Sequence, residues 1–188
     1  MRSRIKRSLT AAAAACLTAG LPAAAAADMP VTYKDQGRSL FAVDVPDYWS
    51  VRAGGARALT APGSGETRQV GRVLGLRPTA EEGLWMGFLS PDTIRTQEQA
   101  LRYLREIGPF LLRNATVVDR GAVTIGGRPA ARITGSGTRG GRSVSFTALT
   151  IDLPGNRIAI SVVVMEAGVN PALVADVNAI YSSFRPVY

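Results

Sequence analysis

The stretch Arg157–Met165 (RIAISVVVM) has a clear strand pattern. Within it, isoleucine and valine residues alternate with alanine, serine and valine, so β-branched side chains fall on one face at a period of two. The turn sequence Pro154-Gly155-Asn156 precedes it, and the alternating run Val144–Ala148 lies before that turn. We therefore predict a buried strand at the centre of an antiparallel sheet.

The remaining predicted elements lie on both sides of this stretch. A first helix is expected to begin at Thr96, with Gln99 at capping-box spacing, and to end at Gly108-Pro109. A second begins at Asn170 and Pro171 and closes the chain. The predicted strands are Ser39–Val45, Arg57–Thr60, Gln69–Leu76, Leu84–Leu89, Thr116–Ile125, Arg128–Gly135 and Arg142–Leu153. Two helices that cover an antiparallel sheet make an α+β fold.

Glycine is concentrated between two of these strands. Gly135–Gly140 (GSGTRG) matches the G-x-G-x-x-G pattern of dinucleotide-binding sites. That site needs a helix after the loop, so that the helix N-terminus faces the pyrophosphate. Here a strand follows, and we predict that Gly135–Gly141 is a hairpin loop without a cofactor.

The first 27 residues have the composition of a secretory signal peptide. A basic start is followed by an alanine-rich apolar run, and Ala25 and Ala27 precede a predicted cleavage site before Asp28. We expect residues 28–38 to be a flexible lead-in and residues 39–188 to be one domain. The protein would then be exported to the periplasm or the extracellular space, and would not be an integral membrane protein. Lipidation at Cys16, which would tether the protein to a membrane, is the alternative.

Charge and cysteine content change when this leader is removed. The whole chain has 22 basic and 14 acidic residues, but four of the basic residues lie within the leader, so the remainder carries +4 rather than +8. Its basic residues are dispersed, which argues against a nucleic-acid partner. An envelope protein or an anionic envelope component, such as a lipid headgroup, remains a possible partner. Cys16 is the only cysteine, so the mature chain would have no disulfide.

The sequence offers little for catalysis. It contains no histidine, which excludes the usual serine and cysteine triads and the usual zinc sites. No loop has the alternating oxygen ligands of a calcium site, and we predict neither a metal nor a cofactor. A carboxylate-dependent hydrolase stays open, and its candidate residues are Asp44, Asp47, Glu81, Glu82, Asp92 and Asp152. Such an enzyme requires two carboxylates that converge in a cleft, whereas a binding protein requires an exposed apolar or arginine-rich groove.

Two tryptophans are the large aromatic candidates for partner contact. Trp85 lies within the apolar run Leu84–Leu89 and is expected in the core. Trp49 follows a turn, and it is our candidate for a partner-binding residue.

Three segments resemble the PsbP-like superfamily, which includes the Mog, LpqN-type and DcrB families. They are Phe41–Trp49 (FAVDVPDYW), Ile125–Ala130 (IGGRPA) and Ile180–Phe184 (IYSSF), with a capped helix between the first two. The resemblance covers about Ser39–Arg185. It implies a three-layer α/β/α sandwich around an antiparallel sheet, and an accessory or binding role without catalysis. It transfers no catalytic residue.

Overall fold

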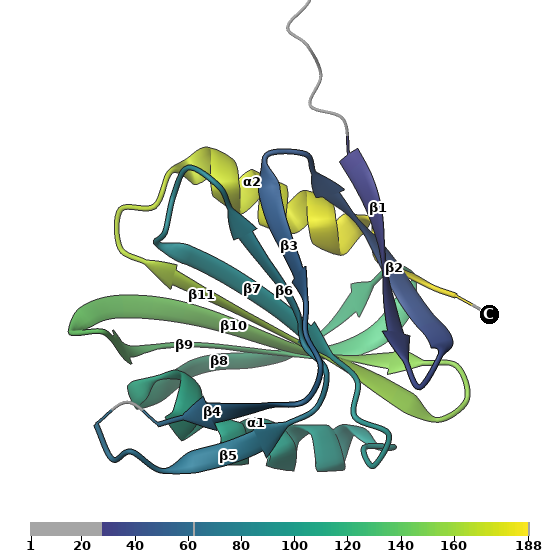
Figure 1. Ribbon diagram of the computed structural model, residues 1–188, viewed down its shortest axis with the longest axis horizontal. Helices are drawn as coiled ribbons and strands as arrows, with labels where there is room; N and C mark the ends of the chain where they lie inside the picture. The colour runs from purple at the N-terminus through teal and green to yellow at the C-terminus, as the bar shows by residue number, and fades with distance from the viewer. Residues whose placement is uncertain (1–27, 62, 188) are drawn as a thin grey trace, which may run out of the picture.

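A seven-stranded antiparallel sheet forms the centre of the molecule in the computed structural model, which describes residues 28–61 and 63–187 (Figure 1). The stretch predicted to be central is β11, the fourth of the seven strands, with β7 and β10 on its two sides. In spatial order the strands are β3 (Trp49–Ala53), β6 (Leu74–Pro78), β7 (Leu84–Leu89), β11 (Arg157–Glu166), β10 (Arg142–Leu153), β9 (Arg128–Arg139) and β8 (Arg113–Ile125).

One face of this sheet is covered by helix α2 (Pro171–Ser182) and a small second sheet. That second sheet contains β1 (Asp28–Asp35), β2 (Arg38–Pro46) and β12 (Arg185–Pro186) (Figure 1). The main core lies between these layers. Its centre is an aromatic cluster in which the Phe41 ring lies 5.0 Å from that of Phe184 and 5.7 Å from that of Phe88.

The opposite face is covered by helix α1 (Gln97–Leu111) and by the hairpin of β4 (Arg57–Thr60) and β5 (Thr67–Val70). The hairpin is a separate two-stranded sheet. With a helix on each side of an antiparallel sheet, the molecule has the predicted α+β architecture. Within the described residues, neither helix is long and apolar enough to cross a membrane.

The helix starts follow the predicted capping. The Thr96 side chain accepts a hydrogen bond from the Gln99 backbone N–H, the Gln99 side chain accepts one in return, and Asn170 caps α2. The predicted end of α1 is wrong, because the helix continues past Pro109 to Leu111. Proline removes one donor, but the Leu112 N–H still bonds to the Gly108 carbonyl at 3.0 Å, so the last turn stays closed.

The predicted flexible lead-in over residues 28–38 is also wrong, because β1 pairs with β2 along its whole length. Tyr33 is 3% exposed and stacks on Phe41 with ring centroids 4.8 Å apart. Asp35 forms an ion pair with Arg157 at 2.9 Å. The segment is polar overall. Val31 is the only other residue of β1 that packs against the main core, and two inward side chains with one ion pair are too weak a sequence pattern to predict a strand.

The glycine-rich segment after residue 135 is largely strand instead of loop. Strand β9 runs to Arg139, and only Gly140-Gly141 form the turn into β10. A Cβ atom at Gly135 would lie 2.2 Å from the Thr116 carbonyl oxygen and 2.6 Å from the Phe146 ring. Glycine is therefore required there for close packing within the sheet. The predicted strand Gln69–Leu76 is divided between β5 and β6. Residues 1–27, with Cys16, Ala25 and Ala27, lie outside the described part of the chain.

Candidate functional site

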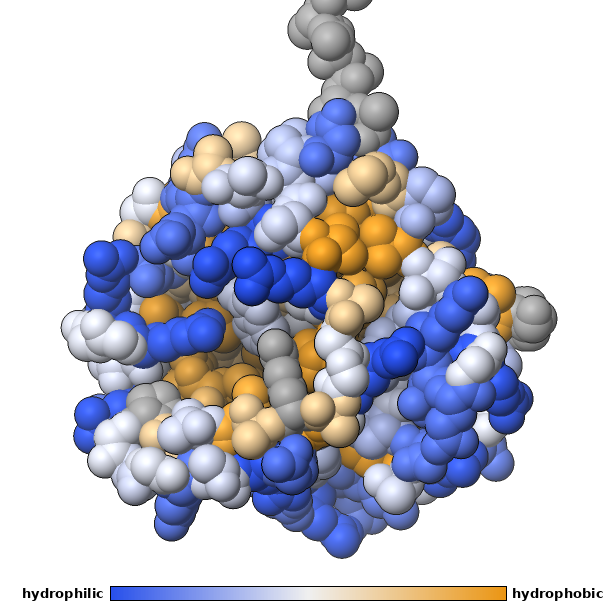
Figure 2. Space-filling model, viewed as in Figure 1, coloured by the Kyte–Doolittle hydropathy of each residue, from blue (hydrophilic) through white to orange (hydrophobic). Residues whose placement is uncertain are grey.

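A cavity of about 640 Å³ opens on the α1 face, and we call it the arginine groove. It lies between β3, β6 and β7 on one side and the β4–β5 hairpin with the C-terminal half of α1 on the other. Figure 2 shows hydrophobic surface at the bottom of a hollow on this face, with hydrophilic residues across its rim. The groove is therefore amphipathic.

Strand alternation determines which side chains reach the groove. In β7, Leu84, Met86 and Phe88 point into the main core and are fully buried, so Trp85 lies on the opposite face. The same alternation places Arg52 of β3 and Arg77 of β6 on the groove side. Because Arg52 pairs with Gly75 and Gly75 with Gly87, these neighbouring strands present one continuous floor.

The floor is the Trp85 indole, which lies over two glycines. A Cβ atom at Gly87 would be 2.5 Å from Cη2 of Trp85, and one at Gly75 would be 3.6 Å from its Nε1. Neither glycine has a positive φ, so their role here is to leave room for the ring. The indole therefore covers the sheet instead of extending toward α1, and the space above it stays open.

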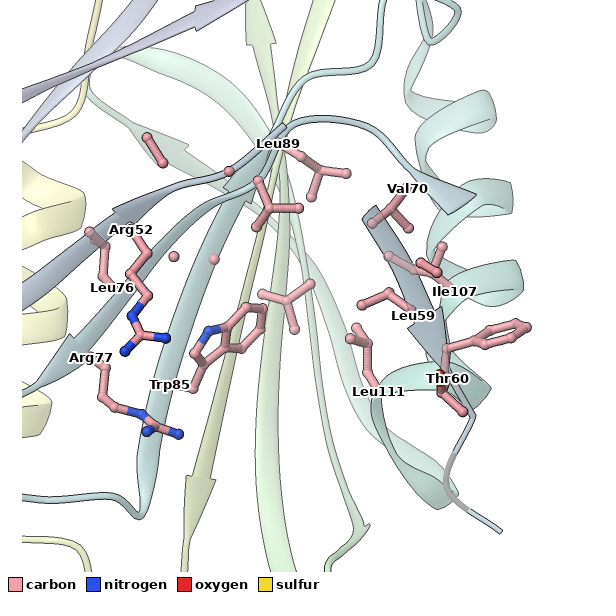
Figure 3. Close-up of a pocket in the computed structure, with 18 of the residues that line it drawn as sticks. Arg52, Leu59, Thr60, Val70, Leu76, Arg77, Trp85, Leu89, Ile107 and Leu111 are labelled. Carbon is pink, nitrogen blue, oxygen red and sulfur yellow. The ribbon is translucent and has the colours of Figure 1, made fainter. Parts of the chain in front are cut away.

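The opposite wall of the groove is apolar. Leu59 and Val70 from the hairpin and Ile107 and Leu111 from α1 face Trp85 across the cavity (Figure 3). The hairpin is held on α1 by Arg68, whose guanidinium forms an ion pair with Glu106 at 2.5 Å and lies 5.9 Å from the Tyr103 ring centre.

Three arginines, Arg52, Arg77 and Arg139, give the groove its charge. Figure 3 shows the guanidinium groups of Arg52 and Arg77 on the side of Trp85 away from the apolar wall. The Arg139 guanidinium lies 5.9 Å from the Trp85 ring centre, within cation–π range. All three residues are exposed to solvent, although neighbouring atoms partly cover the guanidinium of Arg139. Among the described residues, no carboxylate forms an ion pair with any of them and none lines the groove.

Electrostatics near Arg139 favour an anion. Partial burial and repulsion from Arg77 lower the pKa of Arg139, while Glu166 opposes this effect. Glu166 is already paired with Arg142 at 2.7 Å. Both residues line a smaller pocket of about 350 Å³, which shares Arg77, Trp85 and Arg139 with the groove. A bound anion between Arg77 and Arg139 would relieve their mutual repulsion.

The six candidate carboxylates do not surround this groove. Asp44 is bound to Arg185 on the α2 side, Asp152 accepts from Gln97, and Asp92 accepts from Gln36. Glu81 accepts from the Asn170 backbone, and Asp47 is in the turn between β2 and β3. Only Glu82 lines one of the pockets described here, the smaller one. Among the described residues there is also no cluster of three or more ligands that could hold a metal ion.

The two tryptophans have different environments from those expected. Trp49 is 2% exposed, and its indole N–H donates to Asp176 at 3.2 Å, so its neighbour Tyr48 presents more surface, at 44%. Its partner-binding role stays a prediction. Trp85, expected in the core, forms the groove floor. None of the groove arginines was predicted from the sequence, although a glycine inside the Leu84–Leu89 strand is a sign of close approach by another group.

The sequence matches no protein-family model, and no curated protein matches it. Solved structures do match. The cyanobacterial PsbP protein CyanoP from Synechocystis sp. PCC 6803 is 14% identical, with 93% of this chain and 98% of that chain covered and a TM-score of 0.52.

Two further structures are similar at lower TM-scores. LpqN of Mycobacterium tuberculosis, involved in cell envelope biogenesis, is 16% identical over 86% of this chain and 91% of its own, with a TM-score of 0.48. The Ran-binding protein Mog1p of Saccharomyces cerevisiae is 11% identical over 86% of this chain and 96% of its own, with a TM-score of 0.45. At these identities the likeness concerns the fold alone, and the chain has the PsbP-like fold.

Proposed function

We propose that this protein is a non-catalytic binding protein of the bacterial cell envelope, and that its arginine groove holds an anionic ligand. The observation that carries the proposal is the set of three exposed arginines around Trp85 without a carboxylate partner among the described residues. A guanidinium group binds phosphate or carboxylate through paired N–H donors. The apolar wall opposite them favours a ligand that is anionic at one end only.

Export is part of this proposal. Cleavage between Ala27 and Asp28 would release a chain that begins at β1, and lipidation at Cys16 would instead leave it tethered to a membrane. The mass of the mature N-terminus separates these two outcomes. An accessory role matches what the resemblance to PsbP-like proteins implies.

Isothermal titration calorimetry with hexyl phosphate tests the groove. We expect saturable binding that the double variant Arg77→Gln/Arg139→Gln weakens at least about tenfold, since each charge-assisted contact contributes about 1.5–3 kcal/mol. The double variant Arg38→Gln/Arg95→Gln is the matched control, because it removes the same charge at two exposed arginines that line none of the three pockets described here. If both double variants weaken hexyl phosphate binding equally, the effect comes from the net charge of the protein, which would contradict the proposal.

The carboxylate-dependent hydrolase is the alternative function. It predicts turnover of a substrate, which a screen of phosphate, glycosyl and carboxylic esters would detect. Turnover that a variant such as Asp152→Asn abolishes would replace the binding proposal with the enzymatic one.

A further inference from the structure

A second cavity of about 560 Å³ lies on the other side of the α1 C-terminus, and we call it the α1 cavity. It is an open hollow between α1 and strands β8, β9 and β10, and Ala61, Ser64 and Glu66 also line it. Most of its inner lining is apolar: Leu101, Leu104, Leu112, Ile133, Phe146 and Ala148. It shares Leu111 and Val162 with the arginine groove, so the two hollows are neighbours on the same face of the sheet, with Leu111 at their boundary.

The α1 cavity is kept open by the same packing device as the groove. Phe146 lies over Gly135, where a Cβ atom would be 2.6 Å from the ring. The ring therefore lies along the sheet and leaves space beneath α1, as the Trp85 ring does over Gly87. The two glycines are on different strands, and each allows a flat aromatic floor under one of two adjoining cavities.

The two hollows differ in the polarity of their inner lining more than in the number of charged residues around them. The groove end has Arg52, Arg77 and Arg139, and the adjoining small pocket adds Arg142 together with two carboxylates, Glu82 and Glu166. The α1 cavity also has charged residues, which like the groove arginines are all exposed: Glu66, Arg105, Arg113 and Arg120. Its inner lining, in contrast, is apolar. Its interior thus offers few hydrogen-bonding partners, and a polar ligand group placed there would lose its contacts with water without replacement.

We propose that the arginine groove and the α1 cavity form one binding site for a single-chain amphiphilic anion. The head, a phosphate or carboxylate, lies among Arg52, Arg77 and Arg139, and the alkyl chain passes Leu111 into the α1 cavity. This inference rests on the proposed function and specifies the chemical class of its ligand. An alkyl chain needs no hydrogen bonds, and it gains from each methylene group removed from water.

Chain length provides the test. Calorimetry would compare hexyl phosphate with dodecyl phosphate, both below the concentration at which they form micelles. Each methylene group that enters an apolar cavity tightens binding by up to about fourfold, so we expect dodecyl phosphate to bind at least about 30-fold more tightly. Uncharged dodecanol, which has a hydroxyl group instead of the phosphate, should bind more weakly than dodecyl phosphate.

Two variants obstruct only the α1 cavity. Ile133→Trp fills it from the sheet, and Ala115→Trp obstructs it at an exposed position where folding is not at risk. In both we expect the advantage of dodecyl phosphate to fall to about threefold or less, because six methylene groups lose their cavity, while hexyl phosphate binds as before. Val118→Trp is the matched control: Val118 is 75% exposed and lines none of the three pockets described here.

The outcomes separate this inference from the proposed function. If hexyl phosphate binds through Arg77 and Arg139 but chain length has no effect, the anion site is supported. The inference that the ligand is a single-chain amphiphile is then wrong. If the chain-length effect survives in both obstructing variants, the chain lies elsewhere, which also overturns the inference. Cosedimentation with phosphatidylglycerol vesicles that is equal for wild type and Ile133→Trp would indicate a membrane surface as the partner instead of a single amphiphile. No binding of either phosphate would overturn both proposals.

Discussion

The open space of the arginine groove depends on a single residue, Gly87. Its missing side chain leaves the space in which the Trp85 ring lies, since a Cβ atom would be 2.5 Å from Cη2. We expect Gly87→Ala to displace the indole into the groove, to reduce the free energy of unfolding by about 1–3 kcal/mol through overpacking, and to weaken hexyl phosphate binding. Urea unfolding and calorimetry measure the two effects.

Gly121→Ala is the matched control for that substitution. Gly121 is also within a strand of the main sheet, but a Cβ atom there would have no heavy atom within 4 Å. Stability and binding should both be retained. A Gly87→Ala protein that binds hexyl phosphate as tightly as wild type would contradict the role assigned to the Trp85 floor.

A buried pair of hydroxyl groups joins α2 to the centre of the sheet. The Ser161 and Tyr181 hydroxyl oxygens are 3.0 Å apart, and both residues are buried. Tyr181→Phe leaves the Ser161 hydroxyl without this partner, and we expect it to reduce the free energy of unfolding by about 1–3 kcal/mol. In a Ser161→Ala background the same substitution should cost less, because no orphan hydroxyl remains. An equal cost in both backgrounds, measured by urea unfolding, would rule out the pairing.

Trp85 and Arg139 show why the sequence predicted strands but missed the groove. The apolar run Leu84–Leu89 was correctly predicted to be a strand, because its composition is a local property of the sequence. Whether side chains fill the space on the other face of the sheet, around Trp85, depends on the distance between the sheet and α1. A local sequence pattern does not encode this distance. Arg139 was assigned to a glycine-rich loop, since the packing of Gly135 against Phe146 becomes visible only when β9 and β10 are paired.

Strand β1 is the element whose removal most directly tests the corrected domain boundary. A chain of residues 39–188 would lose Tyr33 from the core and leave Arg157 without Asp35. Loss of a large buried aromatic side chain alone costs about 3–5 kcal/mol. We therefore expect this chain to unfold at a clearly lower urea concentration than residues 28–188, or not to fold.

Single substitutions separate the contributions within β1. Tyr33→Leu keeps an apolar side chain but gives up the ring stacking and the hydrogen bond to the Arg72 carbonyl at 3.0 Å. Lys34→Ala, at an exposed neighbouring position, should change little. Equal stability of residues 39–188 and 28–188 would restore the lead-in interpretation. Elements with local capping signals, such as α1 at Thr96, were predictable, whereas β1 depends on a partner strand and a distant ion pair.

Stability of the whole molecule should fall at alkaline pH, because four of its five tyrosines have raised pKa values. Burial raises the pKa of Tyr33, Tyr103 and Tyr181. A hydrogen bond to Asp176, at 2.7 Å, raises the pKa of Tyr48 to about 12. In each case the folded state favours the protonated phenol over the phenolate.

The direction of the effect follows from proton binding. Above the ordinary tyrosine pKa of 10.0, the unfolded chain loses protons that the folded chain retains, so increasing pH stabilises the unfolded state. The contribution of these protonated tyrosines to the stability of the folded state is fully present below pH 10. It is lost as the pH rises through the pKa values that the tyrosines have in the folded chain. We expect the urea midpoint to decrease above pH 10 and phenolate absorbance to appear at higher pH in the folded chain than in the unfolded one. Tyr48→Phe should remove one late-ionising group from that titration. Identical titration curves for the folded and unfolded chains would contradict the burial and hydrogen bonding assigned to these four side chains.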